Sequence, residues 1–279
     1  MKVQTNKKLR VKRIGAAGDV LLLEPVLSIL VGSGYEVELL TANPDVLKGM
    51  PGLKCSPLTS LGEGEIDIDF DMVYERNPSV HITEAYMEHI GIDKSFLRKP
   101  KFYTESLMEE DNNPIVISVD TRHHQPHRQI NGLSSDDWSS ITTYLEDTTK
   151  KQVIVVSANL SYCVLNHESH LRKATPTMEA LINTIRSASL FIGNDSLPAH
   201  IANSLNIPSL IFMGSVNPEY RFTDIQPDFH IMQNGCEFSG CYHKVVGIAG
   251  ADCVLEGKEK VKCCTFTKAQ IIRKLSSII

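Results

Sequence analysis

Apolar runs of strand length alternate with helix-length amphipathic runs along the chain, and this alternation limits the possible folds more than any other feature. A strand, a glycine-containing loop, a helix and a second strand follow one another near the start. That order predicts parallel strands, and a parallel sheet needs helices packed over it. The expected elements are a strand at 9–14, a loop at 15–19, a helix at 21–30 ending at Gly32 and Gly34, and a strand at 35–41.

The same alternation returns after an acidic stretch with a proline at 109–114. We therefore predict an α/β protein with two Rossmann-like domains, at 1–112 and 113–279. A last helix is expected at 268–279, and its pattern leaves open whether it packs back on the first domain. The other elements expected are strands at 115–119, 152–157, 190–192 and 209–213, and helices at 134–145 with Ser134 as N-cap, 177–187 and 198–205.

Composition indicates an ordinary globular protein. The chain has 279 residues, of which 42% are hydrophobic and 22% charged. It lacks the run of about 18 apolar residues that a membrane span needs, and the basic start, Met1–Arg13, does not lead into the apolar run of a signal peptide. We expect a cytoplasmic protein. With a net charge of -5, only the basic start offers a track for a polyanion.

A buried strand, a loop of small residues and a helix follow one another at 191–208. Ligands of open α/β sheets bind at the carboxyl ends of strands, where free N–H groups of a helix attract phosphate. Asp195 and Ser196 lie where they can cap the helix or bond a ribose or phosphate, and His200 lies one turn on, able to donate to a pyrophosphate oxygen. Spacing alone favours a plain helix cap and a packed histidine equally well.

Four stretches together resemble one family. The longest runs from Thr175-Pro-Thr-Met-Glu179 through Asn194-Asp195-Ser196 and His200 to Phe212-Met-Gly214, and a second is Gly18-Asp-Val-Leu-Leu-Leu-Glu-Pro25. Weaker matches are Arg128 with Trp138, and a C-terminal set of cysteines, Cys236, Cys241, Cys253 and Cys263. These motifs are similar to those of glycosyltransferase family 9, the ADP-heptose:lipopolysaccharide heptosyltransferases and their relatives.

This resemblance implies a GT-B fold, with two Rossmann-like domains facing each other across a cleft. The shortened N-terminal domain would bind the acceptor, and the C-terminal domain, with its cysteine-containing tail, the nucleotide sugar. The implied reaction is an inverting, metal-independent transfer with Asp19 as general base; the other interpretation of Asp19 is a helix cap. Leu197 departs from the family, which usually carries glycine there. The implied contacts of an ADP- or UDP-linked donor are Gly18, Thr121, Arg122, Arg128, Glu179, Asp195, Ser196, His200 and Gly214.

Three further patterns offer metal ligands. Asp67, Asp69 and Asp71 spell Asp-x-Asp twice, but a solvated edge strand is the better interpretation. The basic, histidine-containing loop Arg122–Arg128 follows a strand, and we favour a diphosphate-facing loop over a metal site. The cysteines at 236, 241, 253 and 263 are compatible with a structural zinc or with buried thiols. We predict no catalytic cofactor.

Several functions stay open at this point. Besides the transferase, the same architecture hosts nucleotide-sugar epimerases and hydrolases, and a nucleotide-binding module without activity is a third possibility. The acceptor is a lipopolysaccharide or other surface saccharide, or, as in phage-type enzymes, a hydroxymethylated base in DNA. Either acceptor predicts a protein of a bacterial or phage-infected bacterial cell, at most peripheral to the inner membrane. The oligomeric state cannot be predicted.

Overall fold

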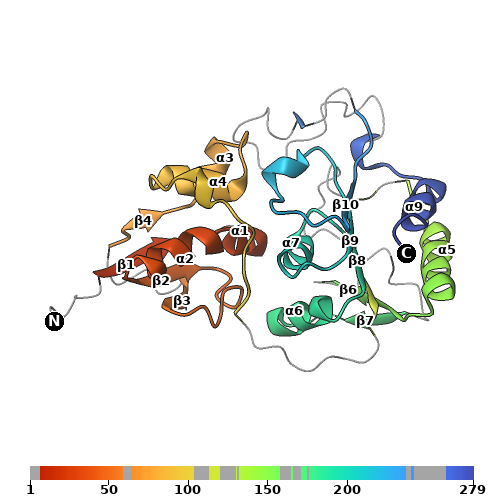
Figure 1. The fold of residues 1–279 in the computed structure, drawn as a ribbon, viewed down its shortest axis with the longest axis horizontal. Coiled ribbons are helices and arrows are strands. Elements are labelled where there is room, and N and C mark those ends of the chain that lie inside the picture. Colours follow the sequence, from red (N-terminus) through yellow and green to blue (C-terminus); the bar gives the residue numbers. More distant parts are fainter. Residues whose placement is uncertain are drawn as a thin grey trace. The chain divides into compact units, whose positions relative to one another are not determined.

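The chain forms two compact units, each built around its own parallel sheet (Figure 1). Unit 1 comprises Met1–Glu105 together with Glu219–Asp224, and unit 2 comprises Ser106–Pro218 and Ile225–Ile279. The predicted boundary between 112 and 113 borders residues outside the described ranges and stays a prediction. The computed structural model describes residues 7–58, 65–103, 113–119, 130, 132–157, 165, 171–174, 176–236, 240–241 and 262–279.

Unit 1 holds a four-stranded parallel sheet in the order β3-β2-β1-β4. Its strands are β1 (Lys7–Lys12), β2 (Tyr35–Thr41), β3 (Leu53–Pro57) and β4 (Ile68–Asp69). Its helices are α1 (Ala17–Leu22), α2 (Glu24–Gly32), α3 (Val73–Arg76) and α4 (Ile82–His89), with a 3-10 turn at Lys94–Phe96.

The single helix predicted at 21–30 is in fact two helices. α1 begins already at Ala17, and α2 begins at Glu24 with Pro25 in its first turn. A continuous helix would place Pro25 in the interior, where its ring clashes with the carbonyl four residues earlier. At the start of α2 the missing N–H of Pro25 costs nothing. The break gives Asp19 a short helix of its own.

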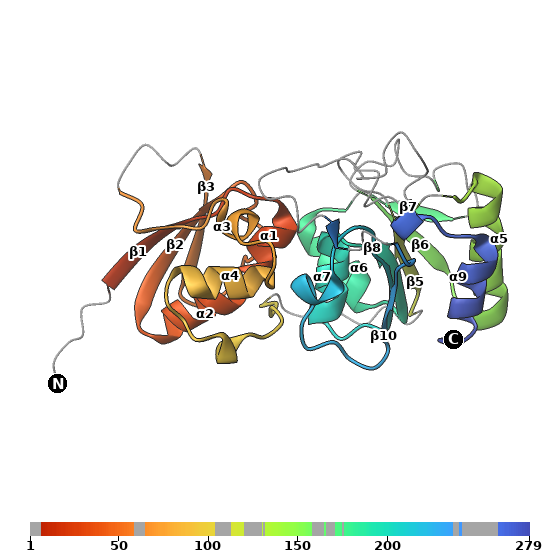
Figure 2. The same cartoon turned by 90° about the horizontal axis from the view of Figure 1, so that it is seen from above.

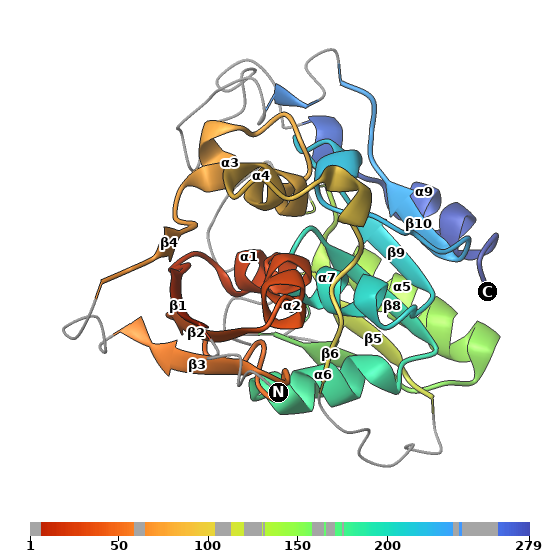
Figure 3. The same ribbon diagram turned by 60° about the vertical axis from the view of Figure 1, so that its left-hand side comes forward.

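The two faces of the unit 1 sheet differ in polarity. Val11 and Leu39 are fully buried on the face toward α1 and α2, which Figure 3 shows on one side of the strands. Arg10, one residue before Val11, points to the opposite face because side chains alternate along a strand. There Arg10 Nε lies 3.3 Å and Lys54 Nζ 2.7 Å from the two carboxylate oxygens of Glu38. The second face is therefore held together by ion pairs.

The three alternating aspartates lie in or beside an edge strand, in agreement with the prediction: Asp69 belongs to β4, the last strand of the sheet, and Asp67 and Asp71 flank it. Each carboxylate fastens this two-residue strand to β1 or to the loop after it. The hydrogen bonds run from Arg10 N to Asp67 Oδ2 at 2.7 Å, from Lys12 Nζ to Asp69 Oδ2 at 2.8 Å, and from Ile14 N to Asp71 Oδ1 at 2.6 Å.

Unit 2 holds a six-stranded parallel sheet in the order β10-β9-β8-β5-β6-β7. Its strands are β5 (Ile115–Ser118), β6 (Val153–Val156), β7 (Arg172–Ala174), β8 (Leu190–Asn194), β9 (Ser209–Phe212) and β10 (Phe229–Met232). Its helices are α5 (Ser135–Thr149), α6 (Met178–Arg186), α7 (Leu197–Ser204) and α9 (Lys268–Leu275), with 3-10 turns at Pro218–Tyr220 and Lys262–Cys264.

Helices cover both faces of this sheet. Figures 1 and 2 show α6 and α7 on one side and α5 and α9 on the other. The last helix does not return to the first domain: α9 packs on α5, where Tyr144 Oη and Ser276 Oγ lie 2.8 Å apart. Trp138, 1% exposed, belongs to the core beneath these two helices. Ser134 caps α5 as predicted, by accepting a hydrogen bond from the Asp137 N–H.

Candidate functional site

Each sheet has one point where the chain reverses the direction in which it adds strands. In unit 1, β2 and β3 lie on one side of β1 and β4 on the other; in unit 2, β6 and β7 lie on one side of β5, and β8 to β10 on the other. Ligands of open α/β sheets bind outside the carboxyl ends of the strands at such a point. Two candidate sites follow: the loops after β1 and β4, and the loops after β5 and β8.

Asp19 lies at the first of these points, in the first turn of α1. Its Oδ2 accepts hydrogen bonds from Ala16 N at 3.1 Å and from Arg13 Nη2 at 3.0 Å. The Oδ1 atom takes no hydrogen bond from any part of the chain that the structure describes, and the side chain is 16% exposed. One oxygen thus caps the helix, and the other is left to accept a proton.

Arg13 holds the Asp19 carboxylate through an ion pair. It is 1% exposed, an unusual position for a guanidinium. Besides Asp19, its Nη2 contacts Glu75 Oε1 at 3.0 Å, and its Nη1 donates to Phe70 O at 3.2 Å. Arg13 therefore joins the end of β1 to the chain after β4 across the switch point.

Two aromatic rings complete the surroundings of Arg13. Its guanidinium carbon lies 5.2 Å from the ring centroid of Tyr74 and 5.7 Å from that of Tyr86, distances that give cation–π attraction. Burial alone would lower the pKa of Arg13, but Tyr86, Asp19 and Glu75 together raise it above its ordinary value. The guanidinium keeps its charge, so the Asp19 carboxylate always has a cation beside it.

The loop after β1 is shaped around this ion pair. A Cβ on Gly15 would lie 2.7 Å from the guanidinium carbon of Arg13, so only glycine fits. Asn43, at the end of β2, donates from Nδ2 to Gly15 O at 3.0 Å and fixes the loop from the other side. Gly18, which was predicted to contact the nucleotide sugar, is half-buried in α1 next to Asp19.

These contacts engage three of the basic residues at the start of the chain, where a basic track was predicted. Arg10 is ion-paired at 3.3 Å, Lys12 at 2.8 Å and Arg13 at 3.0 Å. The hydrogen bonds that Lys12 donates to Asp69 and Asp71 also raise the pKa of Lys12. The charges of these three residues stabilise unit 1, whereas Lys7 and Lys8 are exposed.

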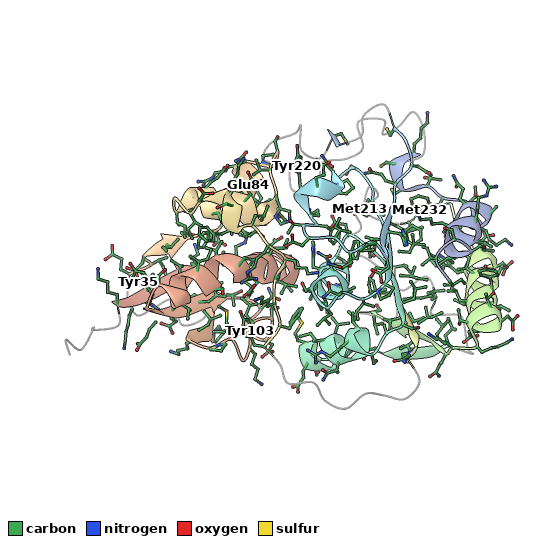
Figure 4. All side chains as sticks on the ribbon, in the orientation of Figure 1. Tyr35, Glu84, Tyr103, Met213, Tyr220 and Met232 are labelled. Atoms are coloured by element: carbon green, nitrogen blue, oxygen red, sulfur yellow. The ribbon has the colours of Figure 1, made fainter. Side chains whose placement is uncertain are left out.

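Glu24, at the start of α2, is a fully buried carboxylate. Arg98 binds both of its oxygens, with Nη1 at 2.7 Å and Nη2 at 3.0 Å. Tyr103 Oη donates at 2.5 Å and Lys101 N at 3.0 Å; Tyr103 is labelled in Figure 4. The segment that leads out of unit 1 is thus fastened to the helix that directly follows α1.

The second switch point lies between β5 and β8, where Ser118 pairs in register with Gly193. After β8, Asp195 Oδ1 lies 3.7 Å from His200 Nε2, with side-chain exposures of 5% and 6%. This distance is too long for a hydrogen bond but allows an ion pair when the imidazole is protonated. The structure brings the predicted residues Asp195 and His200 together at the carboxyl edge of the sheet.

The start of α7 offers fewer free N–H groups than predicted. Ser196 is the N-cap by position, but its hydroxyl donates to Asn194 O at 3.1 Å and does not cap the helix. Pro198 has no N–H, and the N–H groups of the next two residues donate to Ser196 O. Among the described residues of this first turn, only Leu197 has an N–H without a partner. Pro198 therefore leaves fewer free amides here than a helix start without proline would offer.

Gly214 lies at the same edge, after β9. Gln233, just beyond β10, donates from Nε2 to Gly214 O at 2.5 Å and to Val216 O at 3.0 Å, and so holds this loop. One residue earlier, Met213 N donates to Met232 O at 2.9 Å; Figure 4 labels both methionines. Sequence analysis missed Gln233, because nothing in its neighbourhood marks a strand end.

The other residues predicted to contact the nucleotide sugar are either exposed or outside the described residues. Glu179 is exposed in the first turn of α6, which Thr177 caps through Ala180 N at 3.3 Å. Thr121, Arg122 and Arg128 follow β5 in the chain, and they lie outside the described residues. Their position in the sequence, directly after a strand at the switch point, still agrees with a diphosphate-facing loop.

The cysteines do not assemble a metal site in the described part of the chain. No group of three His, Cys, Asp or Glu side chains there could hold a metal ion, and Cys253 lies outside it. Cys263 is buried in the core of unit 2, where a hydrogen bond with Cys264 and burial raise the pKa of its thiol. Cys236 packs against the same core, and Cys241 is half-buried. The structural zinc stays a prediction.

Comparisons with known proteins agree on the fold. No protein-family model and no curated protein matches the sequence. The iron-containing dodecameric glycosyltransferase TibC from enterotoxigenic E. coli matches with a TM-score of 0.80 and 14% identity, over 100% of this chain and 77% of that chain. A family 9 glycosyl transferase from Veillonella parvula gives 0.69 and 12%, over 98% and 97%. E. coli heptosyltransferase WaaC with ADP gives 0.63 and 8%, over 98% and 100%.

The chain therefore has the GT-B glycosyltransferase fold, and the predicted fold class is confirmed. More particularly, it has the fold of the family 9 heptosyltransferases, the group that its motifs resemble. No helix among the described residues is long and apolar enough to cross a membrane.

Proposed function

We propose that this chain is an inverting glycosyltransferase that moves a sugar from a nucleoside diphosphate sugar to an acceptor hydroxyl. The sugar that we propose is heptose. Two independent features support the proposal: the family 9 fold, and the family 9 motifs at Gly18–Pro25 and 175–214. The observation that carries it is Asp19, a carboxylate at a switch point with one oxygen fixed and the other open.

Asp19 is the proposed general base. The acceptor oxygen attacks the anomeric carbon from the side opposite the leaving diphosphate, and its proton passes to Asp19 Oδ1. One carbon–oxygen bond forms as the bond from the anomeric carbon to the diphosphate breaks, which inverts the configuration. Arg13 and the Ala16 N–H hold Oδ2, so the carboxylate meets the acceptor in one orientation.

The nucleoside diphosphate is proposed to bind at the carboxyl edge of the unit 2 sheet. The Leu197 N–H and the His200 imidazole offer hydrogen-bond donors to its oxygens, and Arg122 and Arg128, which lie outside the described residues, follow β5 in the sequence. Positive groups of this kind stabilise the charge that develops on the leaving group without a metal. Thr121, Glu179, Asp195, Ser196, Gly214 and Gly18 are the further contacts proposed for the nucleotide sugar.

The neighbours suggest the donor and the class of acceptor. TibC has been solved in complex with ADP-D-beta-D-heptose and WaaC with ADP, and an E. coli ADP-heptose lps heptosyltransferase II has the same fold. We accordingly propose ADP-heptose as donor and a bacterial surface saccharide as acceptor, in the cytoplasm. A DNA acceptor is not proposed, because the solved structures with this fold include heptosyltransferases bound to ADP or to an ADP-sugar.

The test is a screen of donors and acceptors by mass spectrometry. ADP- and UDP-sugars are offered with lipopolysaccharide core oligosaccharide, with wild type, Asp19→Asn and the exposed control Asp45→Asn. We expect transfer from ADP-heptose by wild type and control, lost in Asp19→Asn and unaffected by EDTA. Conversion of the donor without acceptor, to an epimer or to free sugar, would support the competing epimerase or hydrolase. Metal analysis of the purified protein tests the cysteine prediction separately.

A further inference from the structure

A short piece of the second half of the chain is built into unit 1. The segment Glu219–Asp224 follows the Gly214–Val216 loop in sequence but belongs to the compact unit of Asp19. Arg221 and Phe222 are only 2% and 3% exposed. At the end of the segment, Asp224 Oδ2 accepts a hydrogen bond from Lys99 N at 3.0 Å. We call Glu219–Asp224 the inserted segment.

Arg221 reaches the surroundings of Asp19 through one ring. Its guanidinium carbon lies 5.7 Å from the ring centroid of Tyr74, and the guanidinium carbon of Arg13 lies 5.2 Å from that same centroid. Arg13 in turn holds Asp19 Oδ2 at 3.0 Å. Two buried cations, Arg221 and Arg13, thus contact the Tyr74 ring, and Arg13 also contacts the proposed base, Asp19.

The Tyr74 ring lies in a helix that needs tertiary contacts. It belongs to α3, a four-residue helix whose N-cap residue, Met72, is in the left-handed conformation with φ of 59°. Such a short helix is not stable alone and depends on tertiary contacts. Tyr74 packs edge-on against Tyr86, with 6.4 Å between the ring centroids, and also contacts Arg221, so loss of Arg221 removes one of the contacts that hold the ring beside Arg13.

The inserted segment is also close in sequence to the proposed donor edge. Gln233 holds the carbonyls of Gly214 and Val216 in unit 2, and Arg221 follows Val216 by five positions. The inserted segment thus follows the loop after β9 closely in the sequence.

We propose that Arg221 is a positioning residue for Asp19, acting through Tyr74 and Arg13, so that a segment contributed by the second half of the chain orders the base in the first. The inference rests on the proposed function, because it assigns Asp19 the role of base. Arg221 acts on the orientation of Asp19 and makes no contribution to nucleotide affinity. Removing it should lower kcat and leave the affinity for ADP unchanged.

The kinetic test compares Arg221→Ala and Arg221→Lys with Arg273→Ala, an exposed control in α9. We expect a fall in kcat of roughly 3- to 30-fold for Arg221→Ala, the range of a cation–π contact. Arg221→Lys keeps the cation and should recover part of the loss. The donor KM and the Kd for ADP, by calorimetric titration, should stay within about twofold of wild type. A normal kcat, or a loss confined to KM, would overturn the inference.

Hydrogen exchange supplies a readout that does not need activity. In Arg221→Ala and in Tyr74→Leu, amides of α1 and α3 should exchange faster than in wild type, while those of α9 stay unchanged. A fall in kcat with unchanged exchange would also refute the route through Tyr74. If wild type transfers no sugar to any acceptor but the exchange pattern is as expected, the proposed function fails and the coupling of Arg221 to the Asp19 cluster stands.

Discussion

Replacing Glu24 with alanine should destabilise unit 1 more than any other single change to a carboxylate in it. Glu24 has 0% side-chain exposure and accepts four hydrogen bonds, two of them from Arg98. Removing one partner of a buried ion pair costs about 3–5 kcal/mol, because the other charge stays behind without compensation. Arg98 is 27% exposed and recovers part of its hydration, which favours the lower end of that range.

The orphaned donors add to this cost. Tyr103 Oη and Lys101 N both lose their acceptor, and each unsatisfied group costs about 1 kcal/mol or more when water cannot reach it. Burial, and then the hydrogen bond to Glu24, raise the pKa of Tyr103. Its hydroxyl therefore stays protonated and remains a hydrogen-bond donor. We expect a total loss of about 4 kcal/mol in the free energy of unfolding of unit 1.

Urea denaturation with hydrogen exchange of unit 1 peptides measures this loss, and calorimetry should show a separate early transition. For a unit of this size, about 4 kcal/mol lowers Tm by roughly 16 °C or more. Glu65→Ala, at an exposed position in the same unit, is the control and should change stability by less than about 0.5 kcal/mol. A loss below about 1 kcal/mol in Glu24→Ala would show that water replaces the carboxylate and would refute the reasoning.

Three further outcomes are expected. Asp19→Asn should lower kcat roughly 10²-fold or more, with ADP affinity unchanged by calorimetry; a near-normal kcat would leave Asp19 a helix cap. His200→Ala should weaken ADP binding by about 1–3 kcal/mol, and equal binding by a folded variant would remove it from the site. Hydrogen bonds from Lys54 and Ser56 lower the pKa of Glu38. Its stabilisation is therefore present above the unfolded-state pKa of about 4.3 and lost as pH falls through the lower folded-state value. Glu38→Gln should lower Tm, measured by circular dichroism, more at pH 7 than at pH 3; equal differences at both pH values would contradict this.

The order of strands and helices was predictable wherever apolar runs were long and bounded by glycine or proline. The strands that sequence analysis missed are short edge strands. β7 has three residues, and β3 and β10 carry mixed polar and apolar side chains at partly exposed positions. Pairing with a neighbouring strand determines that such edge segments become strands. Their own hydrophobic pattern is too short to predict a strand.

The candidate site was predictable only where it follows a motif. Asp19 was found through the Gly18–Pro25 motif, and Asp195 and His200 because they follow the buried strand β8. Arg13 was taken as part of a basic start, since its partners Glu75 and Phe70 are far away in sequence and only the sheet order brings them together. Pairings between distant segments of this kind have no signal in a single sequence.

The inserted segment also has a consequence for synthesis on the ribosome. Unit 1 is encoded first, but Arg221 and Phe222, which are buried in it, are made more than a hundred residues after Glu105. At about 5–20 residues per second, the nascent unit waits on the order of 6 to 24 s for its last piece. During that time the Tyr74 face stands uncovered, so this is the stage at which a chaperone would bind and at which the chain is most exposed to aggregation.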